Sequence, residues 1–331
     1  MKKFLVTGGC GFIGSSFVVE QIGQGNLVVN LDKMTYAANE ANVAAVAGHK
    51  NYNFVKGDIG DQALVFKLLE QFEIDWIVNF AAESHVDNSI NSAEVFITTN
   101  INGTFSLLQS ALKYYQELSG DKKQNFRFLH VSTDEVFGSL KEGDPAFTEE
   151  NPYKPNSPYS ASKAASDHLV RAWNETYKLP TIITNCSNNF GPNQHQEKLI
   201  PTIIRSALGG KDIPIYGNGK NIRDWIYVED HCGGIALALV KGKVGESYCF
   251  GGECEIRNID IANMICDILD GVKPREDGLS YRSQIKFVED RKGHDYRYAI
   301  NNLKVRANLG FAIQKGFEDR LAETVEFFIK K

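Results

Sequence analysis

Three side chains that can exchange or hold protons stand next to one another at the end of an apolar run. Thr133, Asp134 and Glu135 follow residues 126–131, whose composition is typical of a buried strand. Ligands of open α/β sheets bind at the carboxyl ends of the strands. We therefore expect these side chains to face a ligand cleft, where two adjacent acids could serve as general acid and general base.

A phenol and an amine follow a short loop later. Tyr159 and Lys163 are four residues apart, so they share one face of the helix that is predicted to start near Tyr159. A phenol has a reference pKa of about 10, and a nearby cation is needed to stabilise the phenolate at neutral pH. Such a pair is a common coincidence on helices, so its interpretation depends on the segments that position it.

The N-terminal segment has the order strand, glycine turn, helix. Residues 3–7 are rich in β-formers, Gly8, Gly11 and Gly14 follow, and residues 15–24 can continue as a helix. This is the context of a dinucleotide site, although the spacing differs from the standard G-x-G-x-x-G fingerprint. Glycines let the backbone approach a pyrophosphate, which a helix N-terminus also favours. A glycine turn can also be purely structural.

An acid at the end of the second predicted strand favours the dinucleotide site. Residues 27–31 form that strand, and Asp32 follows at the place where a ribose 2′-hydroxyl is met, about 20 residues past the glycines. A carboxylate there repels the extra phosphate of NADP, and Lys33 follows instead of an arginine. Turn and acid together predict NAD, whose positive nicotinamide ring would join Lys163 in stabilising the Tyr159 phenolate.

Further strand and helix patterns extend the first unit. Residues 52–55 and 76–80 are typical of strands, and residues 64–72 are typical of a helix between them. This alternation predicts an α/β fold with a Rossmann-type, doubly wound parallel sheet.

The chain is long enough for two lobes. We interpret residues 1–187 as an NAD-binding domain and residues 188–331 as a smaller α/β lobe for the substrate, with a segment of about residues 226–250 packing back on the first domain. A further helix is predicted at residues 316–331. In the predicted helix at residues 94–115, internal breaks in helix propensity suggest a packing or hydrogen-bonding role. The breaks are Asn100 and Gly103.

The composition argues against several classes of protein. The chain has 331 residues, 43% of them hydrophobic, and a formal net charge of −5. Without clusters of Lys and Arg, that charge argues against a nucleic-acid partner. No apolar run approaches the roughly 20 residues needed to span a bilayer and no export signal is visible, so we expect a cytoplasmic protein without a membrane partner. The six cysteines show no C-x-x-C spacing, which predicts free thiols and no metal site.

Over nearly its whole length the chain resembles the extended short-chain dehydrogenase/reductase superfamily, and within it the thymidine-diphosphate-glucose 4,6-dehydratases. Besides the glycine turn, the resemblance rests on motifs in the expected order, at residues 79–87, 132–138, 157–163, 186–192, 198–201, 223–225 and 290–295. The adjacent acids Asp134 and Glu135 are the discriminating feature. Relatives that epimerise or reduce nucleotide sugars usually have small or hydroxyl residues there, and GDP-sugar dehydratases keep only one acid.

The resemblance implies a catalytic role for five residues. Tyr159, supported by Lys163, would take the proton of the sugar 4-hydroxyl while the 4-hydride passes to NAD, and Thr133 would hold the 4-oxygen. Glu135 would then remove the C5 proton, and Asp134 would protonate the departing 6-hydroxyl. Return of the hydride to C6 would complete the conversion of dTDP-glucose to dTDP-4-keto-6-deoxyglucose for deoxysugar biosynthesis.

The resemblance also implies contacts with both ligands. The residues expected at NAD are Gly8, Gly11, Phe12, Ile13, Gly14, Asp32, Lys33, Thr35, Asp58, Ile59, Phe80, Ala81, Ala82, Thr99, Tyr159, Lys163 and Asn189. Those expected at the nucleotide sugar are Ser84, His85, Thr133, Asn188, Lys198, Leu199, Pro214, Tyr216, Arg223, Asn258, Arg291 and His294. The two arginines suit a diphosphate because guanidinium pairs with phosphate through two hydrogen bonds, although each could instead form a surface ion pair. His85 could contact the substrate or cap its loop.

Some questions stay open at this point. A homodimer through helices at residues 94–115 and 159–177 is implied by the resemblance alone. One methyl group in a pocket is worth only about 1 to 3 kcal/mol, so the residues do not separate thymine from uracil. The alternatives are another UDP- or GDP-linked dehydratase or epimerase of the superfamily, and a non-catalytic NAD-sensing protein. The complete set of five catalytic residues argues against the sensor.

Overall fold

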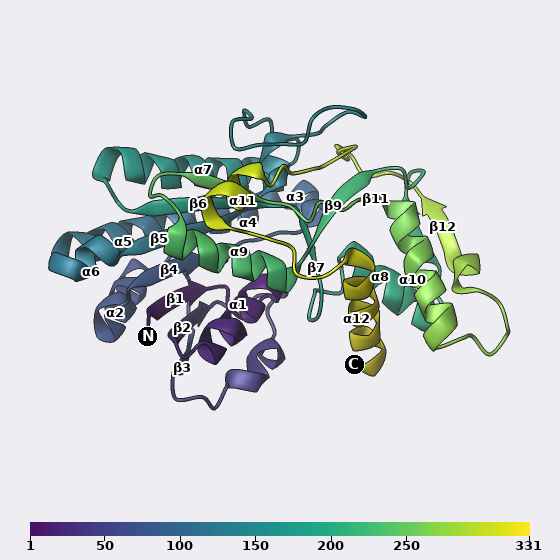
Figure 1. The fold of residues 1–331 in the computed structure, drawn as a ribbon, viewed down its shortest axis with the longest axis horizontal. Helices are drawn as coiled ribbons and strands as arrows, with labels where there is room; N and C mark the ends of the chain where they lie inside the picture. The colour runs from purple at the N-terminus through teal and green to yellow at the C-terminus, as the bar shows by residue number, and fades with distance from the viewer.

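The computed structural model describes residues 1–331 and is built around a seven-stranded sheet, which lies in the left-hand part of Figure 1. Its strands lie in the order β10-β6-β5-β4-β1-β2-β3, and every neighbouring pair is parallel. The strands are β1 (Lys3–Thr7), β2 (Leu27–Asp32), β3 (Tyr52–Lys56), β4 (Trp76–Asn79), β5 (Arg127–Thr133), β6 (Thr181–Cys186) and β10 (Ser247–Phe250). The order reverses between β1 and β4, which is the switch point where doubly wound sheets bind ligands. The predicted Rossmann-type sheet is confirmed.

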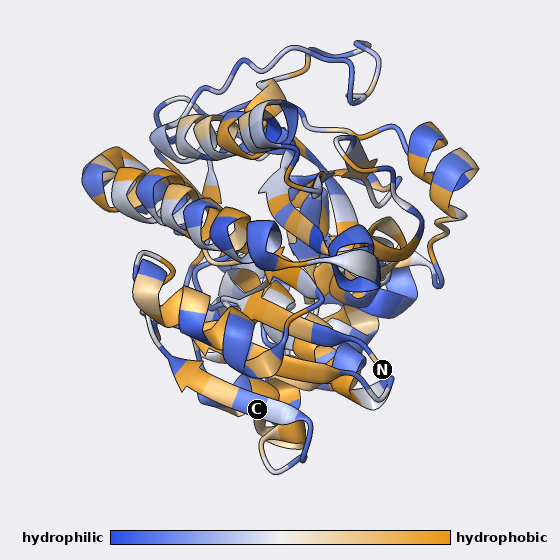
Figure 2. Cartoon of the chain, turned by 90° about the vertical axis from the view of Figure 1, so that its left-hand side faces the viewer, coloured by the Kyte–Doolittle hydropathy of each residue, from blue (hydrophilic) through white to orange (hydrophobic).

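Helices cover both faces of this sheet. The helices of this lobe are α1 (Phe12–Gly23), α2 (Gln62–Phe72), α3 (Val86–Asn91), α4 (Ala93–Phe96), α5 (Thr104–Glu117), α6 (Gly120–Asn125), α7 (Pro158–Tyr177), α9 (Val228–Lys241) and α11 (Leu303–Leu309). Successive side chains of a strand point to opposite faces. Phe4 and Val6 of β1 pack with α1, α9 and α11, whereas Leu5 packs with α2, α5 and α7. Figure 2 shows hydrophobic residues concentrated in the central strands, while many loops are blue or white.

The predicted helix at residues 94–115 is interrupted by a π-helical turn, η2 (Ile97–Gly103). Both breaks in helix propensity lie in this turn. The Asn100 amide accepts a hydrogen bond from the Glu83 backbone N–H at 2.8 Å and donates to the Glu83 carbonyl and to Ser162. A Cβ at Gly103 would lie 2.8 Å from Ile59. Asn100 thus has the hydrogen-bonding role and Gly103 the packing role.

A second lobe lies on the right in Figure 1. It contains β7 (Asn188–Phe190), β8 (Ile213–Tyr216), β9 (Ile222–Tyr227), β11 (Glu255–Arg257), β12 (Ile285–Val288), α8 (Leu199–Leu208), α10 (Asn258–Val272) and α12 (Phe317–Lys330). A separate apolar cluster joins α8, α10 and α12 to β9. Between these elements in sequence, α9 and β10 return to the large sheet. None of the helices combines the length and apolar character needed to cross a membrane.

The short elements η1 (Glu40–Val46), η3 (Asp134–Phe137) and η4 (Tyr281–Gln284) are 3-10 helices. Of these, η3 begins directly where β5 ends. It carries both acids that the sequence singled out. The strand and the short helix therefore place these acids at the carboxyl edge of the sheet.

Candidate active site

The turn after β5 is held by its own hydroxyl. Thr133 is the last residue of the strand, and its Oγ1 accepts a hydrogen bond from the Glu135 backbone N–H at 3.3 Å. The same hydroxyl donates to Asp134 Oδ1 at 3.3 Å. The other carboxyl oxygen of Asp134 is buried without a hydrogen-bond partner. An unpartnered buried oxygen is unfavourable for a carboxylate, so the site favours the protonated acid.

Burial and like charges keep Asp134 neutral. The side chain is 2% exposed. Burial, followed by the charges of Glu135 and Asp224, raises its pKa well above the usual value, and Arg223 opposes this only in part. Two neighbouring carboxyl groups in a closed site cannot both ionise at low cost. Asp134 is therefore the member of the pair that carries a proton it can donate.

Glu135 meets mainly charges of the opposite sign. Burial raises the pKa of Glu135 above its usual value, and so does Asp295, but Lys198, Arg223 and Arg291 lower it in part. These cations favour the carboxylate. The two adjacent acids thus differ in the balance of nearby charges, which mostly raise the pKa of Asp134 and mostly lower the pKa of Glu135. Glu135 is the better base.

A capping box sets the position of the phenol and the amine. Ser157 accepts a hydrogen bond from the Ser160 N–H at 3.0 Å, the Ser160 hydroxyl accepts from the Ser157 N–H, and Pro158 occupies the first turn of α7. With the start of the helix determined in this way, Tyr159 and Lys163 are buried on one face. The cap therefore controls where the phenol lies.

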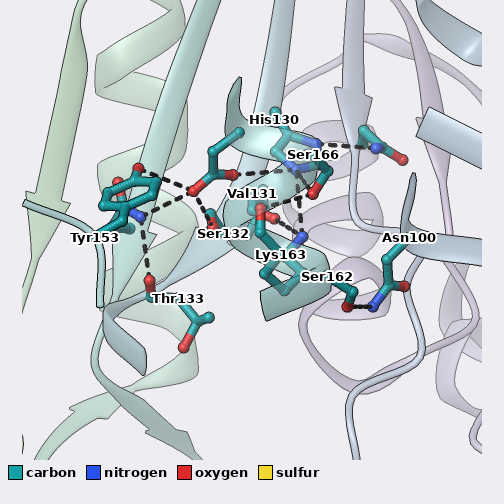
Figure 3. A network of polar contacts seen from close by, with 12 residues as sticks. Asn100, His130, Val131, Ser132, Thr133, Tyr153, Ser162, Lys163 and Ser166 are labelled. Carbon is teal, nitrogen blue, oxygen red and sulfur yellow. Dashed lines mark hydrogen bonds and ion pairs between the residues drawn. The ribbon is translucent and has the colours of Figure 1, made fainter. Parts of the chain in front are cut away.

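Burial of the phenol works against its ionisation. The pKa of Tyr159 is raised well above its usual value, first by burial and next by the charge of Glu135, while the nearby Thr133 side chain lowers it in part. Lys163 does not offset this rise. The Lys163 ammonium is instead directed to the Val131 carbonyl, to which it donates at 2.8 Å (Figure 3). The other cation expected to stabilise the phenolate is the nicotinamide ring of bound NAD.

A cavity of about 290 Å³ lies over the carboxyl ends of the strands. All residues that the sequence predicted at the cofactor line it: Gly8, Gly11, Phe12, Ile13, Gly14, Asp32, Lys33, Thr35, Asp58, Ile59, Phe80, Ala81, Ala82, Thr99, Tyr159, Lys163 and Asn189. Thr133, Glu135, Ser84, Asn188 and Lys198 line the same cavity. The phenol, one acid and the glycine turn therefore share one space.

The glycine turn has the shape that a pyrophosphate requires. Gly8 has φ +70° and a Cβ there would lie 2.8 Å from the Ala81 backbone nitrogen, and a Cβ at Gly14 would lie 2.3 Å from the Gly8 carbonyl oxygen. No side chain caps α1, so the N–H groups of its first turn are left for a ligand. Asp32 is held at the end of β2 by N–H groups of Cys10 and Met34 at 2.9 and 2.8 Å. These features fit a bound dinucleotide.

The two predicted phosphate-binding arginines differ in setting. Arg291 donates to Asp87 at 3.1 Å and its guanidinium lies 5.0 Å from the Tyr216 ring. Arg223 is buried, donates to the carbonyl groups of Ile222 and Asp295, and so is not a surface ion pair. Both arginines lie close enough to Glu135 to lower its pKa.

Other predicted substrate residues lie outside the lining of the cavity. These are His85, Leu199, Pro214, Tyr216, Arg223, Asn258, Arg291 and His294. His85 caps α3 by accepting from the Asn88 N–H at 3.4 Å, which is the structural alternative of its two interpretations. His294 contacts Asp290 at 2.6 Å.

Comparison with known proteins identifies the family. The protein-family profile for GDP-mannose 4,6 dehydratase matches residues 5–324. A dTDP-glucose 4,6-dehydratase of Xanthomonas campestris pv. campestris (strain B100) is 53% identical over 329 residues, which cover 99% of this chain and 93% of the relative. The dTDP-glucose 4,6-dehydratase 1 of Escherichia coli (strain K12) is 50% identical over 336 residues, which cover 99% of this chain and 92% of the relative. This chain belongs to the dTDP-glucose 4,6-dehydratase family.

Solved structures agree with this assignment. The crystal structure of the dTDP-glucose 4,6-dehydratase DesIV from Streptomyces venezuelae, with NAD bound, matches with a TM-score of 0.89 and 44% identity and covers 99% of this chain and 97% of that one. A UDP-glucose 4-epimerase from Thermus thermophilus, also solved with NAD, has a TM-score of 0.86 at 25% identity and covers 99% of each chain.

Several residues of the dehydratase cavity had not been predicted. They are Leu31, Ala37, Ala38, Gly57, Glu83, Val131, Ser132, Cys186, Ser187, Gln194, His195 and Glu197. The loop before α8 supplies three of them, and there His195 packs edge-on against Tyr36 at 5.5 Å. Tyr36 and His195 are far apart in sequence and in different lobes, so no local pattern pointed to their contact.

Proposed function

We propose that this dehydratase converts dTDP-glucose to dTDP-4-keto-6-deoxyglucose by oxidation at C4, elimination of water across C5 and C6 and return of hydride to C6. One observation carries the proposal: Asp134 is buried among charges that mostly raise its pKa, whereas the adjacent Glu135 lines the cavity among charges that mostly lower its pKa. Elimination of water needs a base for the C5 proton and an acid for the 6-hydroxyl at the same time. The pair would supply both groups.

We assign the cofactor end of the cavity to NAD. The uncapped N-terminus of α1 and the turn at Gly8 and Gly14 would hold the pyrophosphate, and Asp32 would accept from the ribose hydroxyls. Tyr159 and Lys163 would lie at the nicotinamide end. When bound, NAD supplies the hydride acceptor for C4 and then the hydride donor for C6.

The residues of the chain supply the proton transfers. Tyr159 takes the proton of the 4-hydroxyl, for which the positive nicotinamide ring of bound NAD would have to stabilise its phenolate, and Thr133 holds the 4-oxygen. The resulting ketone acidifies the C5 hydrogen, which Glu135 removes. Asp134 donates its proton to the 6-hydroxyl, which leaves as water, and Glu135 then returns a proton to C5.

The cations of the second lobe serve two purposes in this proposal. Lys198, Arg223 and Arg291 lower the pKa of Glu135, and they would also pair with the diphosphate of the substrate. Lys198 donates to the Ser84 carbonyl at 2.9 Å, which joins the second lobe to the loop after β4. Substrate binding would thus order the groups that support the base.

We further propose that the enzyme is a homodimer through α5 and α7. The helices from α3 to α5 expose Ile90, Val95, Ile97 and Phe105. Tyr177 at the end of α7 is exposed as well, so that apolar side chains continue from one helix to the other. Sedimentation at micromolar concentration tests this: Phe105→Glu should lower the apparent mass of a wild-type dimer, and a monomeric wild type would contradict the proposal.

Mass spectrometry of dTDP-glucose incubated with the purified protein in deuterated water, without added NAD, tests the proposed reaction. We expect a product that has lost water and gained one deuterium at C5. The same incubation with Tyr159→Phe is the control and should leave the sugar unchanged. A product that keeps its 6-oxygen would instead indicate an epimerase.

A further inference from the structure

A buried polar network surrounds the catalytic lysine (Figure 3). The Lys163 ammonium donates to the Val131 carbonyl at 2.8 Å and lies 3.3 Å from Nε2 of His130. The same nitrogen of His130 lies 3.5 Å from Oδ1 of Asp167. The ammonium and the carboxylate are therefore both neighbours of one imidazole nitrogen.

The two oxygens of Asp167 have different surroundings. Oδ2 accepts hydrogen bonds from the Ser132 hydroxyl at 2.7 Å, the Tyr153 hydroxyl at 3.0 Å and the Asn185 amide at 3.5 Å. Oδ1 is buried and accepts no hydrogen bond. The side chain is 1% exposed. A carboxylate this deeply buried needs a cation as well as hydrogen bonds, so the question is which cation it has.

His130 is not that cation. Burial, with the charge of Lys163 added, lowers the pKa of His130 well below its usual value, so the imidazole is neutral. The pKa of Asp167 is raised to about 6 by burial and lowered chiefly by Lys163, so the carboxyl group is ionised above that pH. Lys163 is the cation that remains.

No other acidic group near Lys163 serves as its counter-charge. On β6 the pKa of Cys186 is raised to about 12, and the pKa of Tyr153 in the loop before α7 is raised as well, both chiefly by burial, so both groups are neutral. Tyr159 and Asp134 are held protonated, as described above. Glu135 has cations of its own, which lower its pKa and belong to the second lobe, so it is not the partner of Lys163.

We propose that Asp167 is a positioning residue whose buried carboxylate is the counter-charge of Lys163, keeping the ammonium protonated and directed to the Val131 carbonyl, with neutral His130 between the two charges. The proposal rests on the proposed catalytic role of Lys163 and extends it to a residue that does not line the cavity. Removing the carboxylate leaves burial as the main influence on the pKa of Lys163 and so lowers that pKa further.

The pH dependence of Asp167→Asn separates this role from a structural one. Lys163 should lose its proton at lower pH in the variant, so the alkaline limb of turnover should move down by about one pH unit or more. NAD content after gel filtration at each pH gives a second readout that needs no turnover, and its alkaline limb should move by the same amount. The proposal would be overturned if activity fell equally at all pH values and the alkaline limbs of turnover and of NAD content both stayed in place.

Tyr153→Phe is the matched control. It also removes a hydrogen bond from the Asp167 oxygen, but it leaves the carboxylate, which stays ionised at alkaline pH. Its alkaline limb should stay at the wild-type position. A limb that moves as far as in Asp167→Asn would show that damage to the network, and not loss of charge, causes the shift.

A double-mutant cycle on melting temperature provides a test that does not depend on catalysis. Lys163→Met and Asp167→Asn each leave one buried charge unpaired, whereas the double variant leaves none. We expect the double variant to lose much less stability than the two single losses added together, and simple additivity would overturn the proposal. A wild type that fails to dehydrate the sugar would refute the proposed function without altering this cycle.

Discussion

Replacing Asp134 by Asn removes the proposed acid while keeping its shape and, at neutral pH, its charge. Burial, Glu135 and Asp224 raise the pKa of this side chain, so the folded protein already holds it neutral. The amide oxygen can still accept the hydrogen bond of Thr133, but the amide cannot protonate a departing hydroxyl. General acid catalysis is worth about 10²- to 10⁴-fold, and we expect turnover to fall by about that factor.

The same substitution should stabilise the protein near pH 7. A carboxyl group whose pKa is higher in the folded state disfavours folding once the pH exceeds its unfolded pKa of about 3.9, because only the unfolded chain can then ionise. Each pKa unit of that difference costs about 1.4 kcal/mol. Asp134→Asn removes this cost, so its gain in melting temperature should be present near pH 7 and shrink as the pH falls toward about 4.

Two measurements check this reasoning. Scanning calorimetry of the wild type and the variant near pH 7 and near pH 4 tests whether Asp134 is neutral in the folded protein. A lower melting temperature of the variant near pH 7 would refute this neutral state. Mass spectrometry in deuterated water tests the division of roles, because Glu135 should still exchange the C5 proton. Recovered dTDP-glucose should contain deuterium at C5 without loss of water, and undiminished water loss would refute the assignment of the acid.

Three further substitutions test other parts of the site. Glu135→Gln should leave NAD bound and reducible by the substrate but abolish both C5 exchange and water loss, and full turnover would contradict the assigned base. Gly14→Ala should lower the NAD content of the purified protein, because its Cβ would lie 2.3 Å from a backbone oxygen, whereas Gly23→Ala meets open space and should retain NAD. Asn100→Ala removes three buried hydrogen bonds and should lower the free energy of unfolding by about 1 to 3 kcal/mol in denaturant titrations, and an unchanged midpoint would contradict the role of its amide.

Local features of the chain were predictable because neighbouring residues decide them. The strand, the glycine turn and the helix at the N-terminus depend on residues that are close together in the chain. Glycine is needed at positions 8 and 14 because a Cβ there would meet the backbone. The parallel order of the first strands follows from the alternation of strands and helices. The π-helical turn around Asn100 was predicted only as a break in helix propensity, since its amide acts on Glu83, which is distant in sequence.

The sequence by itself determined which chemical groups gather at the carboxyl edge of the sheet, because Thr133, Asp134 and Glu135 are adjacent in the chain and follow one strand. Only the tertiary structure decided which of the two acids keeps its proton. That choice depends on Asp224 near one acid and on Lys198 near the other, and the second lobe carries both of these residues. The physical reason is that a pKa depends on burial and on charges close in space, whatever their separation along the chain.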